Sequence, residues 1–193
     1  MEYLIKTKSI GGMTEEQFFQ FCQENDSIKF EKNANGEIII MAPTGSETDK
    51  FNTEITSDLV IWNRKSKAGY VFGSNAGFTL PNNAVRSPDG AFIRKDLWNQ
   101  VDPSDRKKFA HICPDFVLEL LSESDHPRTL QEKMKDWMDN GCELGWMINP
   151  IKKETWIYRK NGEVEIKSFD SALSGEDVLP GFTLDLSGIF VDE

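Results

Sequence analysis

Apolar residues recur along the chain at two spacings, and each spacing predicts a type of secondary structure. Apolar positions three or four residues apart predict helices at residues 14–22, 47–65 and 128–140. Short apolar runs between turn residues predict strands at 28–32, 37–41, 70–80, 87–94, 116–122, 145–149, 155–159 and 164–167. Asn-Gly pairs at 35–36 and 161–162 predict two hairpins. This order of elements predicts an α/β fold with a mixed central sheet flanked by helices.

Length and composition favour one compact unit in a reducing compartment. The 193 residues suit a single domain spanning 1–193, and 38% hydrophobic residues are enough for a core. No apolar run reaches the roughly 18 residues that cross a bilayer, and the start of the chain lacks the pattern of a signal peptide. The three cysteines are too few and too dispersed for a disulfide framework. We therefore expect a soluble, cytoplasmic protein.

The net charge and the number of histidines restrict how the protein can bind nucleic acid and metal ions. Acidic residues outnumber basic ones by 32 to 22, a net charge of −10, which argues against tight nonspecific binding to nucleic acid. A local basic cleft can coexist with this acidic remainder, so weak, salt-sensitive binding stays open. With only two histidines, a zinc site would need both. Any metal ion should therefore be held by carboxylates.

Two acidic residues interrupt strands that otherwise read as buried. Glu119 lies in the middle of the apolar run 116–121, and Asp89 lies beside small residues in the run 88–93. A buried carboxylate without a partner costs several kcal/mol, so Glu119 must have one. If the two strands are neighbours, about 4.8 Å apart, the two acids can share one divalent cation. The alternative for each acid is a structural salt bridge or a capped turn.

Several segments together resemble the Uma-two family, bacterial proteins assigned as restriction endonucleases. The resemblance covers nearly the whole chain through the order and spacing of its motifs. The segments that carry it are 36–43, 86–92, 114–122, the positions Leu130, Lys133 and Trp137, 141–150 and 179–182. This resemblance implies the restriction-endonuclease-like fold of the PD-(D/E)XK phosphodiesterases. It also implies a scaffold for a metal-dependent nuclease.

The metal-binding motif of this family is matched to the present sequence residue by residue. Asp89 matches its metal-binding Asp, and Glu119 matches its second acid. The lysine expected two residues after Glu119 is missing, because Leu121 stands there. The substitute is Lys133 on the following helix. Lys133 lies at one edge of the helix face that points inward, and Gln131 lies at the other edge. The alternative for Lys133 is a solvated helix lysine.

Further roles follow from the same resemblance. The carbonyl of Leu120 completes the metal shell, and Glu54 on the long helix is a candidate additional ligand. The family's usual histidine is replaced by Thr48, which puts full activity in question. Arg128, or the basic cluster 106–108, is the candidate contact for the substrate phosphate.

The expected activity is Mg²⁺- or Mn²⁺-dependent hydrolysis of phosphodiester bonds in nucleic acid, with DNA the first candidate. Asp89 and Glu119 hold the ion, and Lys133 orients or deprotonates the attacking water. The main alternative is an inactive binding or assembly protein on the same fold. A carboxylate-pair glycosidase is a weaker one. The resemblance also suggests a homodimer, with an interface near an exposed Trp146 or Trp156.

Overall fold

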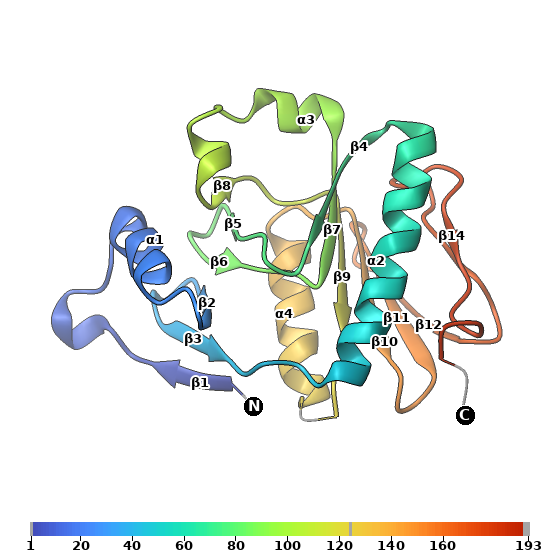
Figure 1. The fold of residues 1–193 in the computed structure, drawn as a ribbon, viewed down its shortest axis with the longest axis horizontal. Coiled ribbons are helices and arrows are strands. Elements are labelled where there is room, and N and C mark those ends of the chain that lie inside the picture. Colours follow the sequence, from blue (N-terminus) through green and yellow to red (C-terminus); the bar gives the residue numbers. More distant parts are fainter. Residues whose placement is uncertain (1, 124, 191–193) are drawn as a thin grey trace. The chain divides into compact units, whose positions relative to one another are not determined.

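The computed structural model describes residues 2–123 and 125–190 (Figure 1). The chain divides into two compact units, and each is described by itself. The first comprises Met1–Pro43, Asn75–Ser87 and Val101–Cys113. The second comprises Thr44–Ser74, Pro88–Gln100 and Pro114–Glu193. The single domain spanning 1–193 stays a prediction.

A small sheet with the strand order β1-β3-β2-β6-β5-β8 forms the first unit. Its strands are β1 (Glu2–Ile5), β2 (Lys29–Lys32), β3 (Ile38–Met41), β5 (Phe78–Thr79), β6 (Val85–Arg86) and β8 (Ala110–His111). Its helices are α1 (Glu15–Glu24) and the short 3-10 turns η1 (Lys8–Ile10) and η2 (Asp105–Lys107). The predicted β2–β3 hairpin is confirmed as an antiparallel pair, with Gly36 at a φ of 78° in its turn.

Helix α1 begins where the sequence predicts. The Thr14 side chain accepts a hydrogen bond from the Gln17 amide, and the Gln17 side chain accepts one from the Thr14 amide. This reciprocal pair satisfies two of the amides that a helix start leaves without partners. The helix then buries Phe18 against Phe30 and Val85 in the core of this unit.

A mixed six-stranded sheet with the order β12-β11-β10-β9-β7-β4 forms the second unit. Its strands are β4 (Gly69–Gly73), β7 (Gly90–Arg94), β9 (Phe116–Leu120), β10 (Leu144–Asn149), β11 (Glu154–Arg159) and β12 (Val164–Ser168). The β9–β10 pair is parallel and the other four pairs are antiparallel. A small sheet of β13 (Leu173–Ser174) and β14 (Thr183–Leu184) follows.

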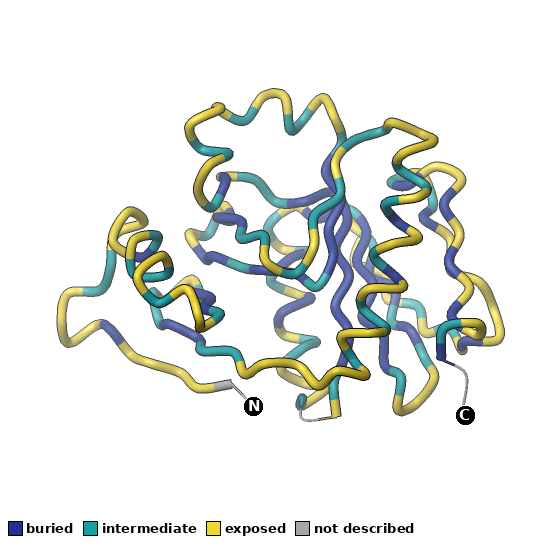
Figure 2. Tube along the Cα trace, viewed as in Figure 1, coloured by how far each residue is buried: buried dark blue, intermediate teal, exposed yellow. Residues whose placement is uncertain are grey.

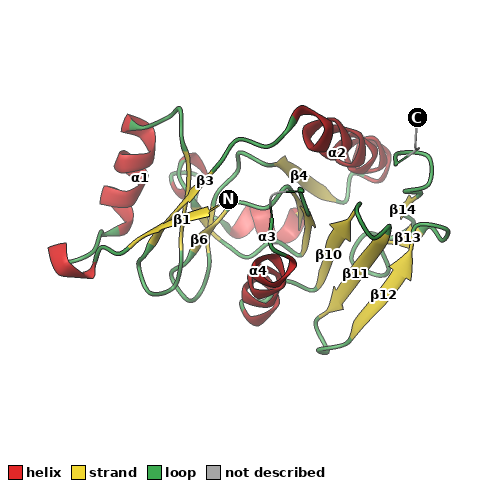
Figure 3. Ribbon diagram, turned by 90° about the horizontal axis from the view of Figure 1, so that it is seen from below, coloured by secondary structure: helices red, strands yellow, loops and turns green. Residues whose placement is uncertain are grey.

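Helices cover both faces of this mixed sheet. They are α2 (Ser46–Ser66), α3 (Lys95–Gln100) and α4 (Pro127–Asp139), with α2 and α4 on opposite faces (Figure 3). The face toward α2 carries the larger core, where Ile55 and Leu59 join Leu118 of β9 and the C-terminal segment 169–190. Figure 2 shows the central strands buried and the outer sides of both helices exposed. The predicted mixed sheet flanked by helices is confirmed.

The structure corrects three expectations from the sequence. The predicted strand 70–80 is two strands, β4 and β5, which pair in different sheets. Helix α3, at 95–100, was not predicted, because six residues are too few for a periodic pattern. Trp146 has no exposed surface, since it faces the core from β10, so it cannot form an exposed interface. Within the described chain, no helix is long and apolar enough to span a bilayer.

A histidine between two acids links the start of α1 to the start of η2 in the first unit. His111 Nδ1 lies 2.9 Å from Asp105 Oδ1, and its Nε2 lies 2.9 Å from Glu15 Oε2. The hydrogen bond to Asp105 raises the pKa of His111 above its ordinary value of 6.5, and the bond to Glu15 adds to this. The charged imidazolium is therefore favoured in the folded state.

We expect this contact to make stability depend on pH. A raised folded pKa gives a contribution that is present below pH 6.5 and lost as pH rises through the folded value. The His111→Gln variant should therefore be less stable than wild type mainly at low pH, by less than about 1 kcal/mol because the pair is exposed. Urea unfolding from pH 5 to 8.5 tests this, with His126→Gln as the control. A difference that stays constant with pH would contradict it.

Candidate functional site

The two predicted acids lie next to the same end of the β7–β9 ladder. Strand β7 pairs with β9 so that Gly90 lies opposite Leu118 and Ala91 opposite Val117. Asp89 is the bend residue just before β7, and Glu119 follows Leu118 in β9. The Asp89 carboxylate continues the pairing, because its Oδ2 accepts a hydrogen bond of 2.8 Å from the Leu120 amide.

Glu119 is buried and held by donors from α4. Its neighbours Leu118 and Leu120 face the core beneath α2, so the alternation of the strand turns Glu119 to the opposite face. There Lys133 Nζ lies 2.9 Å from Oε1 and 3.1 Å from Oε2, and the Trp137 indole donates to Oε1 at 2.9 Å. The Glu119 and Lys133 side chains are only 2% and 7% exposed. These bonds compensate for the loss of hydration of both charges.

Helix α4 distributes its polar side chains between the sheet and the solvent. Pro127 occupies its first turn, where a missing amide costs nothing, and residues four apart then share a face. Lys133 and Trp137 therefore point inward together. Arg128 is 89% exposed and pairs with Glu132 on the outer side. Gln131 is half-buried and makes no hydrogen bond to Glu119.

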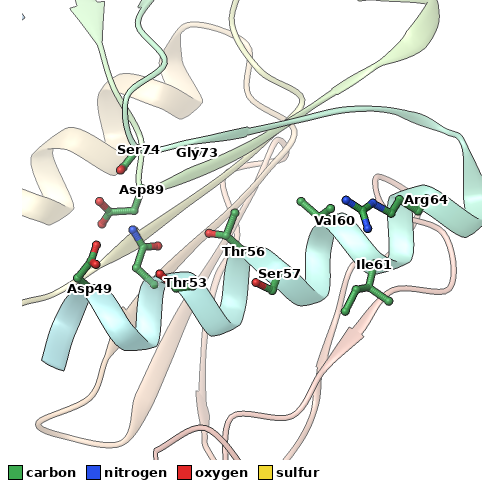
Figure 4. Close-up of a pocket in the computed structure, with 11 residues that line it drawn as sticks. Asp49, Thr53, Thr56, Ser57, Val60, Ile61, Arg64, Gly73, Ser74 and Asp89 are labelled. Carbon is green, nitrogen blue, oxygen red and sulfur yellow. The ribbon is translucent and has the colours of Figure 1, made fainter. Parts of the chain in front are cut away.

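A polar groove of about 470 Å³ runs along α2 next to Asp89 (Figure 4). Asp89 and Ser74 lie across from the N-terminal half of the helix, and Arg64 lies near its C-terminal end. The helix contributes Asp49, Thr53 and other residues that recur every three or four positions. Asp89 therefore belongs to this groove, whereas Glu119 is held against α4.

The helix acid beside Asp89 differs from the one that the sequence suggested. Asp49 lines the groove with Asp89, while Glu54 is exposed and is not among the lining residues. At about 100° per residue, Glu54 lies about 140° around α2 from Asp49. The polar repeat 49-52-53-56 beside the apolar repeat 51-55-59 was the signal in the sequence that identifies Asp49.

The donor chemistry near Asp89 suits a hard divalent cation. Within the described chain, no cluster of three or more His, Cys, Asp or Glu side chains could hold a metal ion. Mg²⁺ accepts one or two carboxylates completed by backbone oxygen and water, so Asp89, Glu119 and the Leu120 carbonyl fit its preferences. Glu119 would then have to share its carboxylate between the ion and the Lys133 ammonium.

The basic cluster 106–108 belongs to the first unit, where two of its side chains already bond to other residues. Arg106 donates to the Val101 carbonyl, and Lys108 forms an ion pair with Glu16. Neither Arg106 nor Lys108 belongs to the unit that contains Asp89 and Glu119.

Comparison with known proteins gives a matching family model and similar solved structures. A family model described as "Uma2: Putative restriction endonuclease" matches residues 15–187. The fold is similar to the crystal structure of "a putative nuclease belonging to DUF820 from Anabaena variabilis", with a TM-score of 0.75 and 17% identity. That alignment covers 92% of this chain and 97% of the other. None of the curated proteins matches the chain.

The buried pair of Glu119 and Lys133 predicts a stability cycle. Glu119→Gln leaves the Lys133 ammonium buried without its carboxylate, which should cost about 3 kcal/mol, and Lys133→Met should cost about as much. The double variant should be more stable than either single variant, because no buried charge remains alone. Urea unfolding in EDTA measures all three.

The exposed pair on the same helix provides the control. Glu132→Gln removes the partner of Arg128 at the surface and should change the free energy of unfolding by less than about 1 kcal/mol. If Glu119→Gln cost no more than this control, the pair would not be a buried structural interaction.

Proposed function

The chain belongs to the Uma2 family, and on that basis we propose that it is a metal-dependent nuclease that hydrolyses phosphodiester bonds, with DNA as the first candidate substrate. The observation that supports this proposal is the hydrogen bond between Asp89 and the Leu120 amide, which holds Asp89 beside the residue that follows Glu119, and Glu119 is itself paired with a buried lysine. The small number and wide spacing of its three cysteines suit the cytoplasm.

In this proposal Asp89 and Glu119 hold Mg²⁺ or Mn²⁺, and the Leu120 carbonyl adds a backbone ligand. When bound, such an ion neutralises charge on the phosphate oxygens and lowers the pKa of its water. Asp89 suits this role, because it is half-buried at the mouth of the groove and Leu120 holds one of its oxygens.

Lys133 contributes a fixed hydrogen-bond donor beside Glu119. The Glu119 carboxylate holds the lysine Nζ at a distance of 2.9 Å. We therefore assign Lys133 to orienting the attacking water and stabilising negative charge in the transition state, ahead of deprotonating that water. Because the site fixes the ammonium before substrate arrives, the reaction avoids the cost of reorganising it.

An inactive binding protein on the same fold is the second candidate. It is favoured by the hydrogen bonds from Lys133 and Trp137, which account for the burial of Glu119 without any metal ion. In that case the acids are structural, and neither metal binding nor cleavage depends on them.

Metal binding separates these two candidates before any substrate is chosen. If Mn²⁺ binds the folded protein through Asp89, Mn²⁺ at about 100 times its Kd should stabilise the fold by about 2.7 kcal/mol. Asp89→Asn should lose most of this stabilisation, and Asp58→Asn, on α2 outside the groove, should keep it. Thermal melts over a Mn²⁺ titration measure the effect. If Mn²⁺ stabilised both variants equally, Asp89 would not be a ligand of the metal site.

Cleavage tests the reaction itself. Asp89→Asn and Lys133→Met should each reduce Mn²⁺-dependent cleavage of DNA by about 100-fold or more, since each removes charge stabilisation in the transition state. Supercoiled plasmid and end-labelled single strands of DNA and RNA serve as substrates, with Asp58→Asn as the control. If Asp89→Asn cleaved as fast as wild type, the proposed active site would be wrong.

A further inference from the structure

The groove beside Asp89 follows one stripe of α2 over most of the helix. The residues of α2 that line it are Asp49, Asn52, Thr53, Thr56, Ser57, Val60, Ile61 and Arg64. These residues recur every three or four positions, and they lie beside the apolar stripe that packs α2 on the sheet. The remaining flank of the helix carries Asp58 and Lys65, which do not line the groove.

The lack of a side chain at Gly73 leaves part of the space that this groove occupies. Gly73 of β4 lies directly opposite Gly90 of β7 in the ladder. A Cβ added to Gly90 would lie 3.6 Å from Thr56 Oγ1, so this face of the pair looks toward α2. Directly paired residues share a face, so a side chain at Gly73 would enter the groove as well. A Cβ there would meet nothing within 4 Å.

The lining offers the groups that contact a sugar-phosphate backbone. It has hydroxyls from Thr53 and Thr56, and the Asn52 amide oxygen is buried without a hydrogen-bond donor within the described chain. Arg64 is exposed at the far end, and it pairs with no carboxylate of the described residues. Hydroxyl, amide and guanidinium groups are the usual contacts to phosphate and sugar. No lining residue between 49 and 89 is aromatic, so the groove offers bases no ring to stack on.

The dimensions fit one strand. Thr53 and Arg64 are 11 positions apart, which is about 17 Å along a helix at about 1.5 Å per residue. At the spacing of about 3.4 Å between stacked nucleotides, this distance corresponds to about five nucleotides of a stacked strand. A volume of about 470 Å³ cannot enclose a double helix, whose major groove alone is about 12 Å wide.

We propose that this groove binds the backbone of a single nucleic-acid strand, with Arg64 contacting a phosphate about five nucleotides from the one at Asp89. The inference rests on the proposed nuclease function and narrows its substrate to single-stranded segments, including frayed or unpaired ends of duplexes. The bases point away from the groove, so binding depends little on sequence.

Binding in EDTA tests this proposal without any need for cleavage. Fluorescence anisotropy is measured with an end-labelled 12-nucleotide DNA strand and with the same strand in a duplex, at low salt. Wild type should bind the single strand about tenfold or more tightly than the duplex, and Arg64→Ala should weaken single-strand binding about tenfold, since one phosphate contact is lost. Lys65→Ala removes the same charge outside the groove and should change the Kd by less than about twofold.

A second variant blocks the groove without removing charge. Gly73→Leu fills the space opposite α2 and should abolish single-strand binding while the thermal melt stays close to wild type. Gly188→Leu is the matched control, because an added Cβ there also meets nothing within 4 Å and the residue is exposed. If neither Arg64→Ala nor Gly73→Leu weakened binding relative to its control, or if the duplex bound as tightly as the single strand, the proposal would be overturned.

The outcomes distinguish this inference from the nuclease function. If single strands bind through Arg64 and Gly73 but no Mn²⁺-dependent cleavage occurs, the groove is a binding site and the nuclease proposal fails. If Asp89-dependent cleavage occurs and neither groove variant changes its KM, the nuclease proposal stands and the groove does not bind substrate.

Discussion

The burial of one carboxylate in the central strand constrains the fold of the second unit. Glu119 is 2% exposed, so its charge must be met by donors within the protein. The Lys133 ammonium and the Trp137 indole provide them, and both come from one face of α4. This requirement fixes the rotation of α4 about its axis and its position along β9. The strand-to-helix packing and the candidate site therefore depend on the same interaction.

On the opposite face of the sheet, α2 presents two neighbouring stripes of side chains with different roles. One stripe of this helix, including Ile55 and Leu59, packs on the strands, and the neighbouring polar stripe borders the groove. Gly73 of β4, a lining residue without a side chain, leaves part of the space of this groove open. Asp89 lies where the β7–β9 ladder ends, so it can reach both the groove and the Leu120 amide.

A second buried acid shows how environment separates structural from chemical roles. Asp115, just before β9, is 3% exposed, and burial raises its pKa. Arg94 opposes that effect with an amide hydrogen bond and a guanidinium contact of 2.6 Å, and it also bonds to Glu143 at the surface. Asp115 is thus part of a network that ties β7 to β9 away from the groove. Asp89, in contrast, lines the groove beside α2.

Local pattern determined helices α1, α2 and α4, the hairpins and the presence of a buried acid that needs a partner, because these depend on neighbours a few residues apart. The contact of Asp89 with the Leu120 amide, next to Glu119, required the packing of segments that are distant in the sequence. The same is true of the division of 70–80 between two sheets and of the burial of Trp146. Periodicity placed Asp49 on a polar stripe of α2, but only the packing of that helix decided that this stripe faces Asp89. A sequence fixes which residues share a face, whereas tertiary contacts decide what that face meets.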